Sequence, residues 1–340
     1  LPYVGRRNEM TRIAFEDFTP GETISYGDKE VTAGEIVAFA RRFDPQPFHL
    51  DAEAGRRSML GGLAASGWHN AAMLMRLSCD AWLNDATGLG SPGIEEMRWM
   101  RPVLAGDRLS VRRTTLDARA LGSRPGIGVV RFMFEVVNQR GEVAMTQRCP
   151  IMFALRDAAA PAPGSYDRPP SGERMTLPPP LDPSQLRGLA DPASHGVVHT
   201  LGTWRPTREE IVAYARDYDP QPFHLDEAAA AASPFGRLSA SGWHTAAKWM
   251  RAMIDAREAV AAALIERGLT PPTPGPSPGF RDLKWLKPVY LGDAITYWTR
   301  IDAVRATSRK GWGLATGANG AVNQHGEPVF EFASGVFTPL

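Results

Sequence analysis

The sequence predicts an α+β protein made of two copies of one folding unit. The segment FDPQPFHLD at 43–51 returns as YDPQPFHLD at 218–226, with eight of nine positions identical at an offset of 175 residues. The segment AASGWHNAA at 64–72 returns at the same offset as SASGWHTAA at 239–247. In each copy these motifs precede a series of β-rich runs. Helices and strands are therefore segregated along each copy, which is typical of an α+β arrangement.

Length and composition limit the classes of protein that remain. A chain of 340 residues suggests about two domains, and 43% hydrophobic residues suffice for packed cores. A net charge of +1 without a basic stripe argues against nucleic-acid binding. Apolar runs fall short of the ~20 residues of a membrane span, and the first residues lack the apolar stretch of a signal peptide. Cys79 and Cys149 cannot build a disulfide framework. We therefore expect a cytoplasmic protein with free thiols and neither a membrane nor a nucleic-acid partner.

The repeat divides the chain into two domains and a linker. We place the first domain at 10–157 and the second at 196–340. Between them, the segment 156–195 holds nine of the 29 prolines and shows no periodicity. Such composition predicts an extended linker over the surface, which we assign to 158–195.

Each copy is predicted to open with a short helix. Thr32 and Glu35 have the spacing of a capping box, which is repeated at Thr207 and Glu210. The first of these helices ends at Asp44, because a residue that precedes proline disfavours the helical region.

A second helix is expected after the next loop of each copy. It runs from Trp68 to about Leu83 in the first copy and from Trp243 to about Ile254 in the second. The segment 71–75 is apolar on nearly every side, which indicates a buried helix.

The remainder of each copy is predicted to form strands. Val, Phe, Thr and Met dominate these runs, and turn segments such as Asn-Gln-Arg-Gly separate them. The expected strands are 96–104, 107–117, 127–138 and 142–155, then 281–290, 293–303, 312–323 and 328–338.

Asp44 and His49 form a candidate catalytic pair, which is repeated as Asp219 and His224. The partners are five residues apart, which would span up to ~17 Å in a fully extended chain, so the loop must curl for the side chains to meet. Two prolines stiffen that loop. A carboxylate beside an imidazole can orient the ring, raise its pKa and help it polarise a water. The alternative is a loop with a solvated histidine, but the repetition of the whole motif favours function.

The start of the second helix is a candidate oxyanion site. Serine is a good N-cap, and glycine allows a ligand to approach the backbone closely. The first amides of the helix are free donors that can stabilise a carbonyl oxygen as it gains negative charge. The alternative is a serine that caps an ordinary core helix. The candidate substrate-binding residues are Ser66, Gly67 and Trp68, with Ser241, Gly242 and Trp243 in the second copy.

His49 and Asp51, together with His69, raise the possibility of a metal site, which is echoed in the second copy. Their residue types suit zinc. However, the candidate ligand set contains no cysteine, and His69 lies in an apolar helix. We therefore expect partly buried histidines and no metal.

A basic-aromatic segment surrounds Trp99 in the first copy and Trp285 in the second. Arg98 and Arg101, replaced by lysines in the second copy, suit the binding of a phosphate or nucleotide. A solvated strand edge is the alternative.

At these motifs the sequence resembles the MaoC-like family of acyl-thioester hydratases and dehydratases. That family's signature is an aspartate, an Asn-Pro pair, a histidine five residues after the aspartate, and later a small-residue-Gly step into a long helix. Asp44, Pro47 and His49, followed by Ser66-Gly67, match it, as does the second copy. The resemblance implies a hot-dog fold, a curved antiparallel sheet wrapped around one central helix. Two such units fused as a pseudo-dimer with a continuous sheet would form a double hot dog.

The resemblance also implies an activity. The substrate would be a 2-enoyl or 3-hydroxyacyl thioester of coenzyme A or an acyl carrier, hydrated or dehydrated reversibly by the Asp-His pair. The oxyanion donor would be the amide of Gly67. Coenzyme A would enter as part of the substrate, and neither a redox cofactor nor a metal is implied. Both copies keep the motif, so we expect two sites, in a homo-oligomer of the fused chain.

Two departures from the family bear on the substrate. Gln46 and Gln221 replace the asparagine and are expected to support the loop. Met75 and Met250 stand where relatives carry a polar residue near the acyl chain. Two other functions stay open on the same fold: a hot-dog thioesterase that hydrolyses the thioester, and a non-catalytic module that binds acyl thioesters.

Overall fold

The computed structural model describes residues 12–159, 161–166, 173–180, 182–185 and 195–340. The first residues of the predicted first domain, and the parts of the predicted linker at 160, 167–172, 181 and 186–194, lie outside the described residues.

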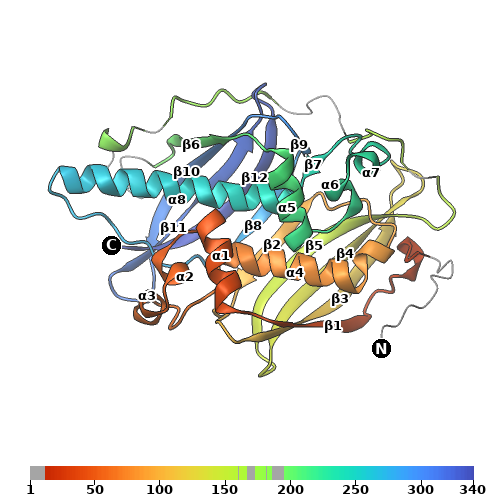
Figure 1. The fold of residues 1–340 in the computed structure, drawn as a ribbon, viewed down its shortest axis with the longest axis horizontal. Coiled ribbons are helices and arrows are strands. Elements are labelled where there is room, and N and C mark those ends of the chain that lie inside the picture. Colours follow the sequence, from red (N-terminus) through yellow and green to blue (C-terminus); the bar gives the residue numbers. More distant parts are fainter. Residues whose placement is uncertain (1–11, 160, 167–172, 181, 186–194) are drawn as a thin grey trace.

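One sheet of ten strands joins the two halves of the chain (Figure 1). Its order is β1-β3-β4-β5-β2-β8-β12-β11-β10-β6, so strands of the first copy fill one half and strands of the second copy fill the other. The first half holds β1 (Thr23–Glu30), β2 (Gly93–Trp99), β3 (Arg108–Ala120), β4 (Ile127–Asn138) and β5 (Val143–Ala154). The second holds β6 (Val198–Trp204), β8 (Gly279–Trp285), β10 (Ile295–Ala306), β11 (Trp312–Val322) and β12 (Pro328–Pro339). A small second sheet pairs β7 (Ser239–Ala240) with β9 (Val289–Tyr290).

The seam between the halves is the antiparallel pair β2–β8. Glycine is required on both of its strands. A Cβ added at Gly93 would lie 2.0 Å from the carbonyl oxygen of Leu283, and one added at Gly279 would lie 2.1 Å from that of Met97. These approaches let the sheet continue through the middle of the molecule, as the resemblance implied.

Two long helices lie along the sheet, one from each copy (Figure 1). They are α4 (Gly67–Ala81) and α8 (Gly242–Glu266), and most of α4 is buried. The motif loops begin at the ends of α1 (Ala33–Phe43) and α5 (Arg208–Tyr218). The shorter helices are α2 (Pro47–Leu50), α3 (Ala52–Arg57), α6 (Pro222–Leu225) and α7 (Glu227–Ala231), with 3-10 turns at Phe15–Asp17, Leu83–Asp85 and Pro183–Gln185.

Each long helix also caps a helix of the other half. The guanidinium of Arg76 donates to the carbonyl of Arg216 at 2.9 Å, and that of Arg251 donates to the carbonyl of Arg41 at 3.0 Å. Both carbonyls belong to the last turns of α1 and α5, where a cation is favoured. The motif loops that follow are thus anchored by both halves.

Several sequence-based boundaries were wrong. The segments 96–104 and 281–290 leave regular strand structure at Trp99 and Trp285, shortly before Pro102 and Pro288, which have no amide for the ladder. The outer strands β1 and β6 were missed. The second long helix continues to Glu266 rather than ending near Ile254. In the part of the chain that the structure describes, no helix is long and apolar enough to cross a membrane.

Candidate active site

The first Asp-His pair meets where α1 gives way to α2. Asp44 ends α1, and Pro47 occupies the first position of α2, so one helical turn brings His49 back toward the aspartate. Both side chains are buried, and His49 Nε2 lies 3.4 Å from Asp44 Oδ2. The prolines therefore curl the loop by starting a helix.

The second pair has nearly the same geometry. His224 Nε2 lies 3.6 Å from Asp219 Oδ2, and both residues are again buried. The short helix α6 again carries proline at its first position.

Backbone contacts orient both histidine rings. His49 Nδ1 lies 2.7 Å from the carbonyl oxygen of Ala64, and His224 Nδ1 lies 2.8 Å from that of Ser239. A carbonyl only accepts, so Nδ1 carries a proton, and in the neutral form of the ring Nε2 presents a lone pair. An imidazole lone pair and a carboxylate that face each other can share one donor, such as a water hydroxyl.

The two aspartates differ in their remaining partners. The amides of Gln46 and Gln221 donate to Asp44 Oδ1 at 2.8 Å and to Asp219 Oδ1 at 2.9 Å. The hydroxyl of Ser66 also donates to Asp44 Oδ2, at 2.6 Å. Within the described residues Ser241 makes no such bond. Asp219 instead lies 3.8 Å from the thiol of Cys79, which comes from the other half.

The start of α4 supplies a free backbone donor. The Ser66 hydroxyl accepts from the amide of Trp68 at 3.3 Å, while the amide of Gly67 has no partner in the described part of the chain. The face of Gly67 is covered by the Trp99 indole, because an added Cβ would lie 2.4 Å from Trp99 Cε2. Gly242 and Trp285 repeat the same contact, at 2.4 Å from Cε2. Glycine is thus required at both positions by packing.

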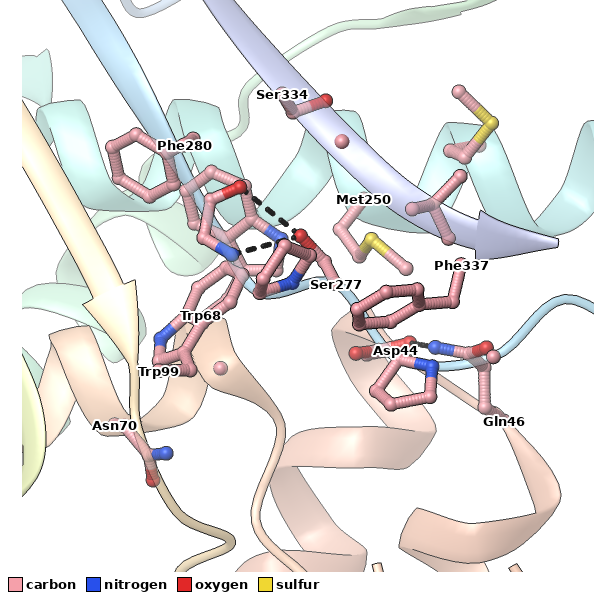
Figure 2. A pocket seen from close by; sticks show the side chains of 18 of the residues that line it. Asp44, Gln46, Trp68, Asn70, Trp99, Met250, Ser277, Phe280, Ser334 and Phe337 are labelled. Atoms are coloured by element: carbon pink, nitrogen blue, oxygen red, sulfur yellow. Dashed lines mark hydrogen bonds between the residues drawn. The ribbon is translucent and has the colours of Figure 1, made fainter. Parts of the chain in front are cut away.

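Two cavities contain these groups, and each is lined by both halves. The first has a volume of about 330 Å³ and is lined by Asp44, His49 and Gly67 together with Met250 and other side chains of α8. Figure 2 shows Asp44 and Met250 in this cavity. The second has a volume of about 720 Å³ and places the second Asp-His pair and Gly242 opposite side chains of the first half. A ligand in either cavity would contact both copies.

Family comparison agrees with this architecture. A family model described as "MaoC like domain" matches the chain twice, over residues 17–126 and 194–313. The chain belongs to the MaoC-like family. Each match includes one Asp-His motif and the helix start that faces it.

Solved structures support the same fold for this MaoC-like protein. A MaoC-domain protein from Chloroflexus aurantiacus is 18% identical and covers 98% of this chain and 99% of its own, with a TM-score of 0.74. A conserved protein of Mycobacterium tuberculosis described as a double hotdog is 16% identical and covers 96% of this chain and 99% of its own, with a TM-score of 0.67. The fold is a double hot dog, as the resemblance implied.

A curated relative shares part of the sequence. Mesaconyl-CoA hydratase of Cereibacter sphaeroides is 29% identical over 156 residues, which are 44% of this chain and 43% of that protein. The chain thus matches less than half of that relative's length.

The other histidines of the motifs pack against aromatic rings in this MaoC-like protein. His69 stacks on Phe39 at 4.5 Å and His244 on Tyr214 at 4.5 Å. Burial lowers the pKa of His69 to about 3 and that of His244 well below its usual range, so both stay neutral. They are fully buried rather than partly buried. Across the described ranges no three His, Cys, Asp or Glu side chains gather closely enough to hold a metal ion.

The basic-aromatic segments lie in the centre of the sheet and not at its edge, but the side chains of Arg98, Arg101 and Lys284 are solvated, each more than half exposed. Their cations are paired with carboxylates on the same strand, on a neighbouring strand or in adjacent turns. The pairs are Arg98–Glu96 at 2.8 Å, Arg101–Glu142 at 3.5 Å, Lys284–Glu331 at 2.8 Å and Lys287–Glu327 at 2.7 Å. Trp99 and Arg101 line the first cavity, and Trp285 and Lys287 line the second.

One group in the first cavity was missed by the sequence analysis. Arg257 of α8 lines it, within the helical extension beyond Ile254. The run AREAVAAALIE is free of Gly and Pro until Gly268, and these strong helix formers were the signal that could have extended the prediction.

Proposed function

We propose that this MaoC-like protein hydrates 2-enoyl thioesters, and dehydrates 3-hydroxyacyl thioesters, at two sites. The observation that carries the proposal is the buried Asp-His pair beside a free helix-start amide in one cavity. Asp44 with His49 and Gly67 form the first site. Asp219 with His224 and Gly242 form the second.

In the proposed reaction the Asp-His pair activates a water. The lone pair of His49 Nε2 and the Asp44 carboxylate take one proton as the water oxygen bonds to Cβ. The Cα–Cβ double bond supplies the electrons that accumulate on the thioester oxygen, where the amide of Gly67 stabilises the enolate-like charge. The proton then passes from the pair to Cα, so one water is consumed and the pair regains its starting state. The reverse sequence eliminates water.

The fixed histidine tautomer supports this role. Because Nδ1 is engaged by a backbone carbonyl, only Nε2 is available to exchange a proton with the reacting water. Gln46 and Ser66 hold the carboxylate, which limits its rotation away from the ring. The second site uses Gln221 in the same way.

The family supports the reaction class, and the Cereibacter sphaeroides relative is a hydratase by name. We propose coenzyme A or an acyl carrier as the thiol part of the substrate, with no further cofactor and no metal. The chain's own residues supply every proton transfer in this scheme.

The test is an activity assay with crotonyl-CoA and longer homologues. Loss of the enoyl absorbance without release of a thiol supports hydration. Release of thiol would establish a thioesterase instead, and binding of acyl thioesters without either change would leave a binding module.

Active-site variants test the two-site arrangement. His49→Ala and His224→Ala should each remove about half of the total activity, and the double variant should remove nearly all of it, because the sites lie in separate cavities. A single variant that is already inactive would contradict two independent sites. Circular dichroism of each variant checks that the fold is retained.

A further inference from the structure

Two arginines that the proposed reaction does not use line the first cavity, and one of them, Arg101, is paired with Glu142 at 3.5 Å. Arg257 lines this cavity from α8, about two turns along the helix from Met250 and one turn from Met253. It is partly buried, and among the described residues its guanidinium makes no hydrogen bond and no ion pair. A desolvated guanidinium without a partner is costly, so a cavity that keeps one is suited to an anionic ligand.

Asp44 does not neutralise this cation by contact. Its two carboxylate oxygens are already engaged by Gln46 and Ser66 and face His49. Burial lowers the pKa of Arg257, while the negative charge of Asp44 raises it, so the aspartate favours the charged form of the arginine at a distance. An arginine held charged and unpaired beside the reacting centre would attract a second anion.

The wall contributed by the second half adds a chain of polar groups. The hydroxyl of Thr299 donates to Asn319 Oδ1 at 2.8 Å, and Asn319 Nδ2 donates to Ser334 Oγ at 2.9 Å. All three residues line the first cavity, and Thr299 and Asn319 are buried. Because the Ser334 oxygen accepts from Asn319, its own proton remains available to a ligand. Figure 2 shows Ser334 and Asp44 on opposite sides of this cavity.

The second cavity is not built in this way. By the repeat and the strand register, the counterparts of Arg257, Thr299, Asn319 and Ser334 are Trp82, Arg113, Phe134 and Cys149, of which only Cys149 lines the second cavity. Trp82 packs against core rings rather than lining the cavity. The arginine that does line the second cavity, Arg124, comes from the turn between β3 and β4. Among the described residues, the hydrogen-bonded chain of Thr299, Asn319 and Ser334 is therefore a feature of the first cavity, whereas the second cavity has polar side chains at other positions, including Gln147, Thr245 and Lys287.

We infer that the first site accepts a thioester whose acyl chain ends in a carboxylate, bound by Arg257 and Ser334. The inference rests on the proposed function and specifies its substrate class. A cavity of about 330 Å³ is at the small end of ligand sites, and suits a short acyl group rather than the nucleotide of coenzyme A. A planar guanidinium matches a carboxylate with two parallel hydrogen bonds, and the serine hydroxyl adds a third donor.

The experiment isolates the first site by silencing the second with His224→Ala, or with Asp219→Asn if the first change fails to fold. In that background two five-carbon substrates are compared by kcat/KM. One is 2-pentenoyl-CoA, which ends in a methyl group, and the other is glutaconyl-CoA, which ends in a carboxylate. Arg257→Met should lower the ratio of carboxylate to methyl substrate by about 10- to 100-fold, as expected for a lost charged hydrogen bond. Arg257→Lys should keep part of that ratio.

The control is Arg305→Met, which removes an exposed arginine of β10 and should leave the ratio unchanged. The inference would be overturned if Arg257→Met left the ratio of kcat/KM for the two substrates unchanged. If that unchanged ratio came with an equal loss of kcat/KM on both substrates, the arginine would be assigned to coenzyme A. Hydration of 2-pentenoyl-CoA with no response to the arginine would leave the proposed function intact.

A binding measurement decides the question if neither substrate is hydrated, which would refute the proposed function. Saturated glutaryl-CoA and valeryl-CoA cannot be hydrated, so their dissociation constants report recognition alone. Glutaryl-CoA should bind at least tenfold more tightly, and Arg257→Met should remove that preference. Equal affinities in the unmodified first site would refute carboxylate recognition.

Discussion

Ser66 and Ser241 offer a matched pair of substitutions within one chain. Both serines cap a long helix through the amide two residues on, at 3.3 Å and 3.2 Å. Only Ser66 also donates to a buried carboxylate, at 2.6 Å from Asp44 Oδ2. Replacing either serine with alanine therefore removes the same helix cap. Only Ser66→Ala also removes a hydrogen-bond donor from a buried carboxylate, that of Asp44.

The expected magnitudes follow from these contacts. Loss of a helix cap costs about 1 kcal/mol, and loss of a hydrogen bond to a charged group costs about 1.5–3 kcal/mol. Ser66→Ala should thus lower the free energy of unfolding by about 2.5–4 kcal/mol, and Ser241→Ala by about 1 kcal/mol. The difference between the two variants should be about 1.5–3 kcal/mol.

Urea unfolding followed by tryptophan fluorescence measures this difference, since the chain has nine tryptophans. The two variants should share the slope of the wild type and differ in their midpoints. Equal midpoints for Ser66→Ala and Ser241→Ala would refute the argument that the bond to Asp44 distinguishes the two sites. A changed slope would instead indicate that the variant had altered the cooperativity of unfolding.

Three further predictions follow from packing, burial and assembly. Gly67→Ala should lower the free energy of unfolding by about 1–3 kcal/mol, because the added Cβ would lie 2.4 Å from the Trp99 indole. The control is Gly122→Ala, whose Cβ would lie in open space and which should leave the free energy of unfolding nearly unchanged. Equal urea midpoints for the two variants would contradict the prediction. The pKa of His69 is about 3 in the fold and about 6.5 unfolded, so the unfolded chain binds the extra proton and stability falls as pH drops below about 6.5. His69→Phe, which keeps a ring against Phe39, should flatten that fall by up to about 1.4 kcal/mol per pH unit in urea unfolding at pH 4 to 6.5, and parallel curves would refute it. We also expect a homo-oligomer of the fused chain, which light scattering of a 37.1 kDa particle at micromolar concentration would reject.

Local sequence was enough to predict the helix caps and the central strands. The bonds from the amides of Glu35 and Glu210 to the hydroxyls of Thr32 and Thr207, both at 3.2 Å, lie where the capping-box spacing predicted them. Cap chemistry depends on residues three positions apart, so it can be read without tertiary information. The outer strands β1 and β6 were missed because each takes its strand character from pairing with β3 or β10, which lie far away in sequence.

The sequence by itself determined that the chain is a duplication and that each copy brings an aspartate and a histidine to a short proline-braced turn. Repetition and proline geometry are local properties, so they are visible in the order of residues alone. Only the tertiary structure decided that the two cavities differ. Arg257, Thr299, Asn319 and Ser334 are far apart along the chain, and they meet in the first cavity because strands β10, β11 and β12 are neighbours in the sheet along which α8 lies (Figure 1). In the first copy, Trp82, Phe134 and Cys149 stand at the positions that correspond to Arg257, Asn319 and Ser334, so two nearly identical motifs lie in differently lined cavities.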